Sequence, residues 1–225
     1  MEGGMAFLID LDGTLVDSVY QHVLAWREAL DEMGMDLAVW RIHRKIGMSG
    51  GLFANALMRE TGHVLSRGEA DRLRQLHEEA YRRRAGQVRP LPGARALLAY
   101  LSEREVPWAV ATSGYLETAG PTLESLGIPE GIPVVTRDQV ERAKPDPDLF
   151  LTAAQRLGVD IADSVVVGDS VWDLLAAQRA RALGVGLLSG GYGQDELQRA
   201  GAYRVYEDPA DLLAHLDEVG IRATP

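Results

Sequence analysis

Short apolar runs alternate with amphipathic segments of helical length along most of the chain. The runs with the length and flanks of buried strands are residues 6–9, 108–112, 132–135, 164–168, 184–188 and 202–206. Helical periodicity between them predicts helices over residues 94–104, 116–126, 148–157 and 171–182. Parallel strands buried on both faces are continuously apolar. The pattern therefore predicts an α/β fold, a doubly wound parallel sheet with helices on both faces.

One long stretch breaks this alternation. From about Ser18 to Arg89 the sequence shows helical periodicity and no convincing strand. Its apolar stripes contain Leu24, Leu30, Leu37, Val39, Ile42, Ile46, Leu52, Leu57, Leu73, Leu76 and Tyr81. Pro90 and Pro92, just beyond it, resist a continuing helix. We therefore predict an all-helical domain of residues 17–89, inserted after the first strand of a core made of residues 1–16 and 90–225.

Composition excludes several classes of function. The 225 residues carry a formal net charge of −10, whereas a nucleic-acid-binding protein normally presents a basic face. The chain has no cysteine, which excludes disulfides, thiolate catalysis and cysteine-bound zinc. No apolar run approaches the roughly 20 residues that span a bilayer, and the N-terminus lacks the basic region of a signal peptide. We expect a cytoplasmic protein with no membrane or nucleic-acid partner.

The strongest chemical signal follows directly on the first apolar run. It is the segment Asp10-Leu-Asp-Gly-Thr-Leu-Val-Asp17. In an extended segment residues 10 and 12 point to the same side, so Asp10 and Asp12 would face one spot at the carboxyl edge of the sheet. Ligands bind at that edge in open α/β folds. Gly13 would permit a sharp turn immediately afterwards.

Three more segments with candidate functional residues follow the first one along the chain. They are Ala111-Thr112-Ser113-Gly114, Lys144-Pro145, and Gly168-Asp169-Ser170 with Asp173 four residues after Asp169. Together with the first segment they resemble the motifs of the haloacid dehalogenase superfamily, in particular its phosphoglycolate-phosphatase-like and β-phosphoglucomutase-like branch. The resemblance covers nearly the whole chain, and the helical insert matches the position of the family's cap domain. It implies a phosphatase that acts on a small phosphorylated metabolite.

The chemistry explains why such residues occur together. A phosphate ester and a carboxylate nucleophile repel each other, and a hard cation with oxygen ligands, such as Mg²⁺, relieves that repulsion. Asp10, Asp169 and the backbone carbonyl of Asp12 are the predicted ligands, supported by the resemblance, with Asp173 acting through water or orienting a neighbour. Lys144 is a compact cation that can contact both the phosphoryl group and the nucleophile.

The expected reaction uses Asp10 as nucleophile and forms an aspartyl phosphate. Asp12 protonates the leaving oxygen and then deprotonates the water that hydrolyses the intermediate. The Thr112 hydroxyl and the amides of Ser113 and Gly114 can donate to phosphoryl oxygens. The resemblance also implies that Thr14 contributes to this site by orienting Asp12.

Three weaker signals, at Gly47, His22 and Trp172, each allow two interpretations. The segment from Lys45 to Gly51 is glycine-rich, and Gly47 lies either in a substrate-binding loop or in a plain connection between helices. His22 can reach the cleft, although a partly exposed helix histidine is the favoured interpretation. Trp172 either forms a wall of the site or packs against the core.

The sequence also bears on four alternative functions. A phosphomutase would share the nucleophile, but related mutases often carry Glu-Asp where this chain has Gly168-Asp169. The presence of Asp12 disfavours a dehalogenase and a phosphonatase, with Lys45 leaving a small doubt about the latter. A non-catalytic binding protein would have lost a catalytic carboxylate, and none is lost. The identity of the phosphate ester is left open, and so is the choice between a monomer and a small homo-oligomer.

Overall fold

A six-stranded parallel sheet forms the centre of the computed structural model, which describes residues 5–221. The strands are β1 (Ala6–Ile9), β2 (Trp108–Ala111), β3 (Val134–Val135), β4 (Ser164–Gly168), β5 (Leu183–Leu187) and β6 (Ala202–Tyr206). Their order across the sheet is β3-β2-β1-β4-β5-β6. Because the chain moves outward from β1 in one direction and returns to β4 on its other side, the sheet is doubly wound, as predicted.

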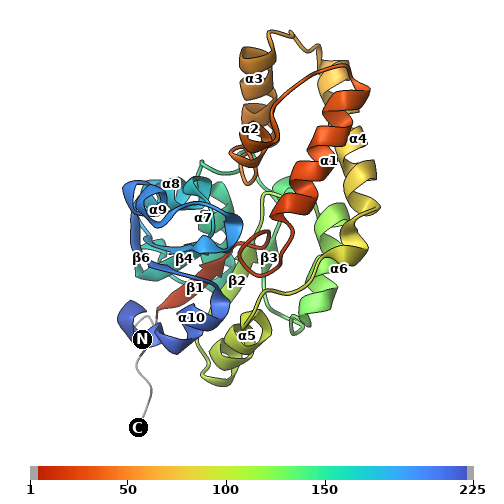
Figure 1. Cartoon of the computed structure of the whole chain (residues 1–225). Coiled ribbons are helices and arrows are strands. Elements are labelled where there is room, and N and C mark those ends of the chain that lie inside the picture. The colour runs from red at the N-terminus through yellow and green to blue at the C-terminus, as the bar shows by residue number, and fades with distance from the viewer. Residues whose placement is uncertain (1–4, 222–225) are drawn as a thin grey trace.

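Helices cover both faces of this sheet (Figure 1). One face packs against α5 (Ala94–Glu103), α6 (Leu116–Leu126) and α10 (Pro209–Ala214). The other packs against α7 (Asp148–Leu157) and α8 (Val171–Ala180), while α9 (Gln194–Arg199) contributes to a small cluster beside β5 and β6. Neighbouring strand residues alternate between the two cores, Phe7 and Ile9 on one side and Leu8 on the other.

Four helices between β1 and α5 form the insertion, above the sheet in Figure 1. They are α1 (Val19–Glu32), α2 (Val39–His43), α3 (Gly50–Thr61) and α4 (Arg67–Arg82). Their apolar side chains, including Leu30, Ile42 and Leu57, form a hydrophobic cluster of their own. A capping box between Ser66 and Glu69 begins α4. The predicted helical insertion is confirmed.

The two segments that join this insertion to the sheet run side by side. The amide of Asp17 donates to the carbonyl of Arg89 at 2.9 Å, and the amide of Leu91 donates to the carbonyl of Leu15 at 2.9 Å. An antiparallel bridge pairs Val16 with Pro90 between them. The proposed domain boundaries at 16/17 and 89/90 fall within this paired connection.

Several details differ from the sequence-based expectations. The third strand is shorter than expected, because Pro133 has no amide to donate and pairing begins at Val134. Leu24 and Val39 are exposed rather than part of the helical core. The remaining short elements are 3₁₀ helices at Ala85–Gln87, Arg137–Gln139, Ile161–Asp163, Leu188–Gly190 and Leu216–Val219. Within residues 5–221, every helix is too short or too polar to cross a bilayer.

Candidate active site

The predicted site residues meet at the carboxyl ends of three adjacent strands. Asp10 follows β1, Thr112 follows β2 and Asp169 follows β4. Strand β1 lies between β2 and β4, so this is the point where the chain direction across the sheet reverses. Such a switch point leaves a crevice between the loops that diverge from it. The fold therefore brings together residues that are more than 150 positions apart.

Lys144 joins two of the carboxylates beneath this crevice. Its side chain is fully buried, and its ammonium contacts Oδ1 of Asp10 and lies 2.8 Å from Oδ1 of Asp173. Burial disfavours the charged ammonium, but the two carboxylates outweigh this effect and raise the pKa of Lys144 above its usual range. A positive charge thus lies directly against the Asp10 carboxylate.

Asp10, Asp169 and Asp173 form a compact carboxylate cluster. One oxygen from each lies within 4.8 Å of the others, and all three residues are buried. Burial raises the pKa of Asp10 from 3.8 to about 7, against the opposing effect of Lys144 and with the help of Asp173 and Asp12. Burial, followed by the charges of Asp173 and Asp10, also raises the pKa of Asp169 well above its usual value. The cluster is short of positive charge, and its oxygen donors suit a divalent cation such as Mg²⁺.

Asp173 has further contacts that fix its orientation. Its Oδ2 accepts a hydrogen bond from the Ser170 hydroxyl at 2.5 Å and another from the Ser170 amide at 3.1 Å. With Oδ1 directed at Lys144, both oxygens have positively polarised partners. These contacts favour the alternative in which Asp173 orients a neighbour, here Lys144.

Asp12 is held by three side chains, two from the start of α1 and one from the segment that follows β2. Its Oδ1 accepts from the Ser18 hydroxyl at 2.6 Å and lies 3.2 Å from Nε2 of His22, while the Thr112 hydroxyl lies 3.4 Å from Oδ2. Burial opposes ionisation, but His22 and the Ser18 hydrogen bond lower the pKa of Asp12 below its usual value. Asp12 is therefore a carboxylate at neutral pH in the substrate-free protein.

Thr14 differs from its expected role. Its hydroxyl is buried and donates to Oδ1 of Asp169 at 2.9 Å, so it orients a predicted metal ligand rather than Asp12. The tight turn at Gly13, with φ of 81°, points the Thr14 side chain towards β4. Ser18, which begins the next helix, takes the place next to Asp12.

The loop after β5 packs against Asp169 and was not predicted from the sequence. A Cβ atom at Gly190 would lie 1.7 Å from Oδ2 of Asp169. The neighbouring Ser189 hydroxyl donates to the carbonyl of Gly13 at 2.6 Å. Only glycine at position 190 leaves room for the Asp169 carboxylate in this arrangement.

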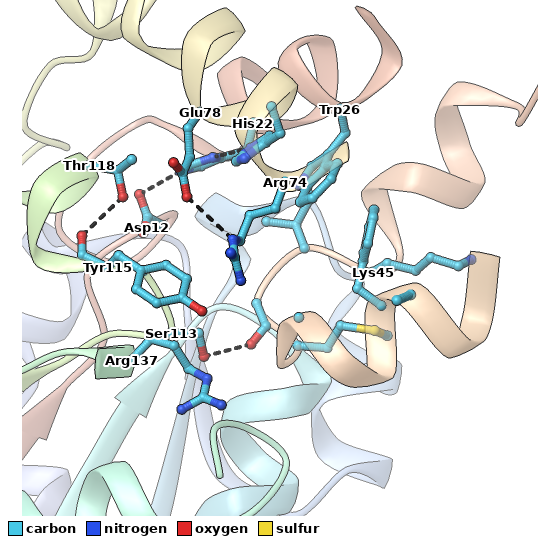
Figure 2. Close-up of a pocket in the computed structure, with 18 of the residues that line it drawn as sticks. Asp12, His22, Trp26, Lys45, Arg74, Glu78, Ser113, Tyr115, Thr118 and Arg137 are labelled. Atoms are coloured by element: carbon cyan, nitrogen blue, oxygen red, sulfur yellow. Dashed lines mark hydrogen bonds and ion pairs between the residues drawn. The ribbon is translucent and has the colours of Figure 1, made fainter. Parts of the chain in front are cut away.

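A cavity of about 350 Å³ opens above Asp10 and Asp12, between the sheet and the insertion (Figure 2). Thr112, Ser113 and Gly114 line it from the sheet side, as predicted. The Gly114 amide donates to the Thr112 hydroxyl oxygen at 2.9 Å, while that hydroxyl donates to Oδ2 of Asp12 at 3.4 Å. The core therefore places hydrogen-bonding groups beside the Asp10 carboxylate.

The glycine-rich loop of the insertion covers the same cavity. Gly47 and Met48 line it, and the Gly47 carbonyl accepts from the Ser113 hydroxyl at 3.0 Å. The Ser49 amide donates to the carbonyl of Lys144 at 2.8 Å. The loop thus contacts two site segments of the core, which favours a role at the site over a plain connection between helices.

Sequence reasoning missed several residues of the cavity wall. His22 was expected either to reach the cleft or to be a partly exposed helix histidine; it is 15% exposed and its Nε2 lies 3.2 Å from Asp12. Arg74, Tyr115 and Arg137 also line the cavity (Figure 2), although the Arg137 guanidinium donates to the carbonyls of Val140 and Glu141. Their positions depend on how α4 lies over the loop after β2. A single residue in a helix or loop gives no sequence signal for such an arrangement.

Two other uncertain residues are resolved by their contacts. Lys45 forms an ion pair with Glu60 at 2.6 Å and donates to the carbonyl of Arg41, so its amine points away from Asp12 (Figure 2). The Trp172 indole donates to the carbonyl of Arg44 at 3.3 Å. Lys45 gives no support to phosphonatase chemistry, and Trp172 joins α8 to the insertion.

Comparisons with known proteins identify the family. A haloacid dehalogenase-like hydrolase model matches residues 5–181. The chain is 33% identical to hexitol phosphatase A of Escherichia coli over 180 residues, 77% of this chain and 78% of that protein. It is 32% identical to a phosphoglycolate phosphatase of Neisseria meningitidis over 198 residues, 84% and 83% of the two chains.

A solved structure agrees with the same assignment. The crystal structure of a hydrolase from Pseudomonas syringae superimposes with a TM-score of 0.94 at 55% sequence identity, covering 96% of this chain and 100% of that one. The likeness includes the parallel sheet and the helical insertion after β1. The chain therefore belongs to the haloacid dehalogenase-like hydrolases and is a phosphatase of that family.

Proposed function

We propose that this protein is a Mg²⁺-dependent phosphohydrolase that cleaves a small phosphate monoester through an aspartyl phosphate on Asp10. The observation that carries the proposal is the arrangement around that carboxylate. Asp10 lies at the floor of the cavity, with Lys144 and the carboxylate cluster on one side and Asp12 on the other. A nucleophile, a cationic group and a separate acid/base group thus surround one cavity.

The cation would be held by Asp10, Asp169 and the backbone carbonyl of Asp12. When bound, Mg²⁺ offsets the repulsion between the carboxylates and the phosphoryl oxygens. Asp173 serves this site indirectly, because its two oxygens are occupied by Lys144 and Ser170. Thr14 keeps the Asp169 carboxylate in place through its hydroxyl.

The residues of this chain divide the reaction between them. An Asp10 oxygen attacks phosphorus and the bond to the leaving oxygen breaks, while Asp12 gives a proton to that oxygen. The arriving phosphate raises the proton affinity of Asp12, which is otherwise ionised. Asp12 then takes a proton from water, which attacks the aspartyl phosphate and restores Asp10. Lys144 and Thr112 stabilise the charge on the phosphoryl oxygens.

The cavity favours a leaving group larger than two carbons. Its volume of about 350 Å³ is at the lower end of ordinary ligand pockets, which span roughly 300–1,000 Å³. The wall formed by the insertion is mostly apolar and includes Trp26, Phe53 and Met48, whereas Arg74 and Arg137 add polar groups to the lining. A phosphorylated sugar or polyol fits this combination of an apolar surface and polar hydrogen-bond donors better than phosphoglycolate does.

Hydrolysis is favoured over mutase chemistry by the residue before Asp169. A Cβ atom at Gly168 would lie 2.3 Å from Cβ of Asp173, so a glutamate cannot occupy this position without displacing Asp173. Asp173 in turn holds Lys144 against the nucleophile. The arrangement of this site therefore depends on glycine at position 168.

The test is a screen of phosphorylated metabolites for release of inorganic phosphate, with Asp10→Asn as the matched inactive variant. We expect phosphate release by the parent protein, greatest with sugar or polyol phosphates, and none above background by the folded variant. A variant that retains activity within tenfold of the parent would contradict the role of Asp10. Interconversion of sugar phosphates without phosphate release would instead identify a mutase.

A further inference from the structure

One histidine of the insertion reaches the loop that packs against Asp169. His43, the last residue of α2, is buried, and its Nε2 lies 2.8 Å from the carbonyl oxygen of Gly190. A carbonyl oxygen only accepts, so His43 is the donor in this contact. Figure 1 shows α2 at the end of the insertion nearest to α8 and α9. The contact therefore joins the insertion to the loop after β5.

The loop of residues 188–191 touches Asp169 through its backbone. A Cβ atom at Gly190 would lie 1.7 Å from Oδ2 of Asp169, so the Gly190 backbone lies directly against that carboxylate. The loop contains two consecutive glycines, and the second, Gly191, has φ of 87°. Glycine loses more conformational freedom on ordering than any other residue. Such a loop depends on contacts from outside to keep one conformation.

The loop has such contacts with both the core and the insertion. From the core, the carbonyl of Gly13 accepts a hydrogen bond from the Ser189 hydroxyl at 2.6 Å. From the insertion, His43 donates to Gly190. The bond from the insertion is therefore the one made to the residue that touches Asp169.

Two aromatic rings hold the His43 imidazole in place for this bond. His43 stacks on Tyr20 of α1 with ring centroids 5.3 Å apart and planes 12° apart. On the core side it packs against Tyr192, with centroids 5.6 Å apart. Ring contacts of this kind fix the position of the imidazole but do not supply a donor. The position of His43 and its hydrogen bond are thus separable by substitution.

We propose that His43 is a positioning residue that holds the Gly190 backbone, and through it the Asp169 carboxylate, in the geometry that accepts a divalent cation. This role rests on the proposed function, in which Asp169 is a ligand. The Thr14 hydroxyl holds Oδ1 of Asp169, and the Gly190 backbone confines Oδ2. Because His43 belongs to the insertion, binding of the cation and docking of the insertion on the core favour each other.

Three substitutions separate the donor from the ring and from a general loosening of the insertion. His43→Phe retains a ring that can pack between Tyr20 and Tyr192 but removes the donor. His43→Gln loses the ring but places an amide donor near the position of Nε2. Tyr192→Phe is the matched control, because it removes a different bond between core and insertion, from the Tyr192 hydroxyl to the carbonyl of Arg44 at 3.1 Å.

The first measurement is calorimetric binding of Mg²⁺ alone, without substrate or turnover. We expect the dissociation constant to rise about fivefold in His43→Phe, since the net value of one hydrogen bond changes an equilibrium constant roughly two- to tenfold. His43→Gln and Tyr192→Phe should stay within about twofold of the parent. Thermal melts of all variants identify any loss caused by unfolding.

The second measurement is hydrogen exchange followed by mass spectrometry, and it includes the parent protein. The Gly191 amide, which donates to the carbonyl of Leu188 at 2.9 Å, reports on the loop. Without metal, a peptide covering residues 188–193 should exchange faster in His43→Phe than in the parent or in Tyr192→Phe. In the parent, Mg²⁺ should slow exchange both in this peptide and in residues 39–46 of the insertion.

Several outcomes would overturn the proposal. Equal Mg²⁺ affinity or equal loop exchange in the parent and His43→Phe would show that the donor has no role. Equal losses in His43→Phe and Tyr192→Phe would assign the effect to docking of the insertion as a whole. Slower exchange in the parent loop without any change in residues 39–46 would show that the insertion is not linked to the cation. A parent protein that binds no Mg²⁺ would contradict the proposed cation site itself, and this inference with it.

Discussion

Replacing Gly190 with alanine places a methyl group where the Asp169 carboxylate lies. The new Cβ would be 1.7 Å from Oδ2, 2.5 Å from Cγ and 2.7 Å from Cβ of Asp169, and ordinary contacts begin at 3.4 Å. Asp169 cannot simply rotate away, because the Thr14 hydroxyl holds its other oxygen at 2.9 Å. Either the carboxylate or the loop of residues 188–191 must therefore move by more than about 1 Å.

The size of the effect follows from that displacement. A misplacement of about 1 Å at a reacting centre costs on the order of 10²-fold in rate, so we expect kcat/KM to fall about 100-fold. The concentration of Mg²⁺ that gives half-maximal rate should rise, because Asp169 is a proposed ligand. Overpacking costs about 1–3 kcal/mol, and each kcal/mol lowers Tm by about 2–4 °C in a chain of this size.

Gly193→Ala, two residues beyond this loop and at the start of α9, is the matched control. Its Cβ would have Glu196 Oε2 at 3.5 Å as its neighbour, which is an ordinary contact. Both variants should be assayed with a small activated phosphate ester across a Mg²⁺ titration, and their Tm values measured by scanning fluorimetry. If Gly190→Ala matches Gly193→Ala in rate and in Mg²⁺ dependence, the packing of this loop against Asp169 does not matter for the reaction.

Three further predictions concern the charges and the covering loop. Lys144→Met should abolish measurable turnover, since it leaves Asp10 beside Asp173 without the shared cation; activity within tenfold of the parent would contradict this. The pKa of Asp10 rises from 3.8 to about 7 on folding, so chelated protein should lose stability as pH rises between these values. Mg²⁺ should therefore raise Tm more above pH 7 than below it. Thermal melts with and without chelator measure this difference, and the Asp10→Asn variant should show a smaller one. Gly47→Leu strains a backbone with φ of 88°, and should change kcat/KM unequally across phosphate esters; equal losses would show that the loop does not discriminate.

The sheet and the carboxylates at its edge were predictable because their signals are local. Runs such as 164–168 are continuously apolar, and the structure confirms them as buried strands. Asp10 and Asp169 follow such strands directly, so the position of each at the sheet edge follows from where its strand ends. No knowledge of side-chain orientation was needed.

The residues that were missed depend on the packing of distant elements. His22 meets Asp12 because α1 leans over the end of β1, and helical periodicity reports which face of a helix is apolar but not where the helix lies. The contact of Gly190 with Asp169 was likewise not predictable, because it depends on the path of the loop after β5. Thr14 was correctly associated with the site, but the turn at Gly13 directs it to Asp169.

The hydrogen bonds between the insertion and the core bear on how the insertion opens and closes over the site. The insertion contacts the segments that carry Lys144, Ser113 and Gly190, through the Ser49 amide, the Gly47 carbonyl and His43 Nε2 at 2.8–3.0 Å. Each such bond contributes about 0.5–1.5 kcal/mol net, so together they amount to a few kcal/mol. A two-state opening with a free-energy difference of that size leaves a minor open population of roughly 0.1–10%. We expect substrate to enter through the open form, and the closed form to complete the proposed site and exclude bulk water from it.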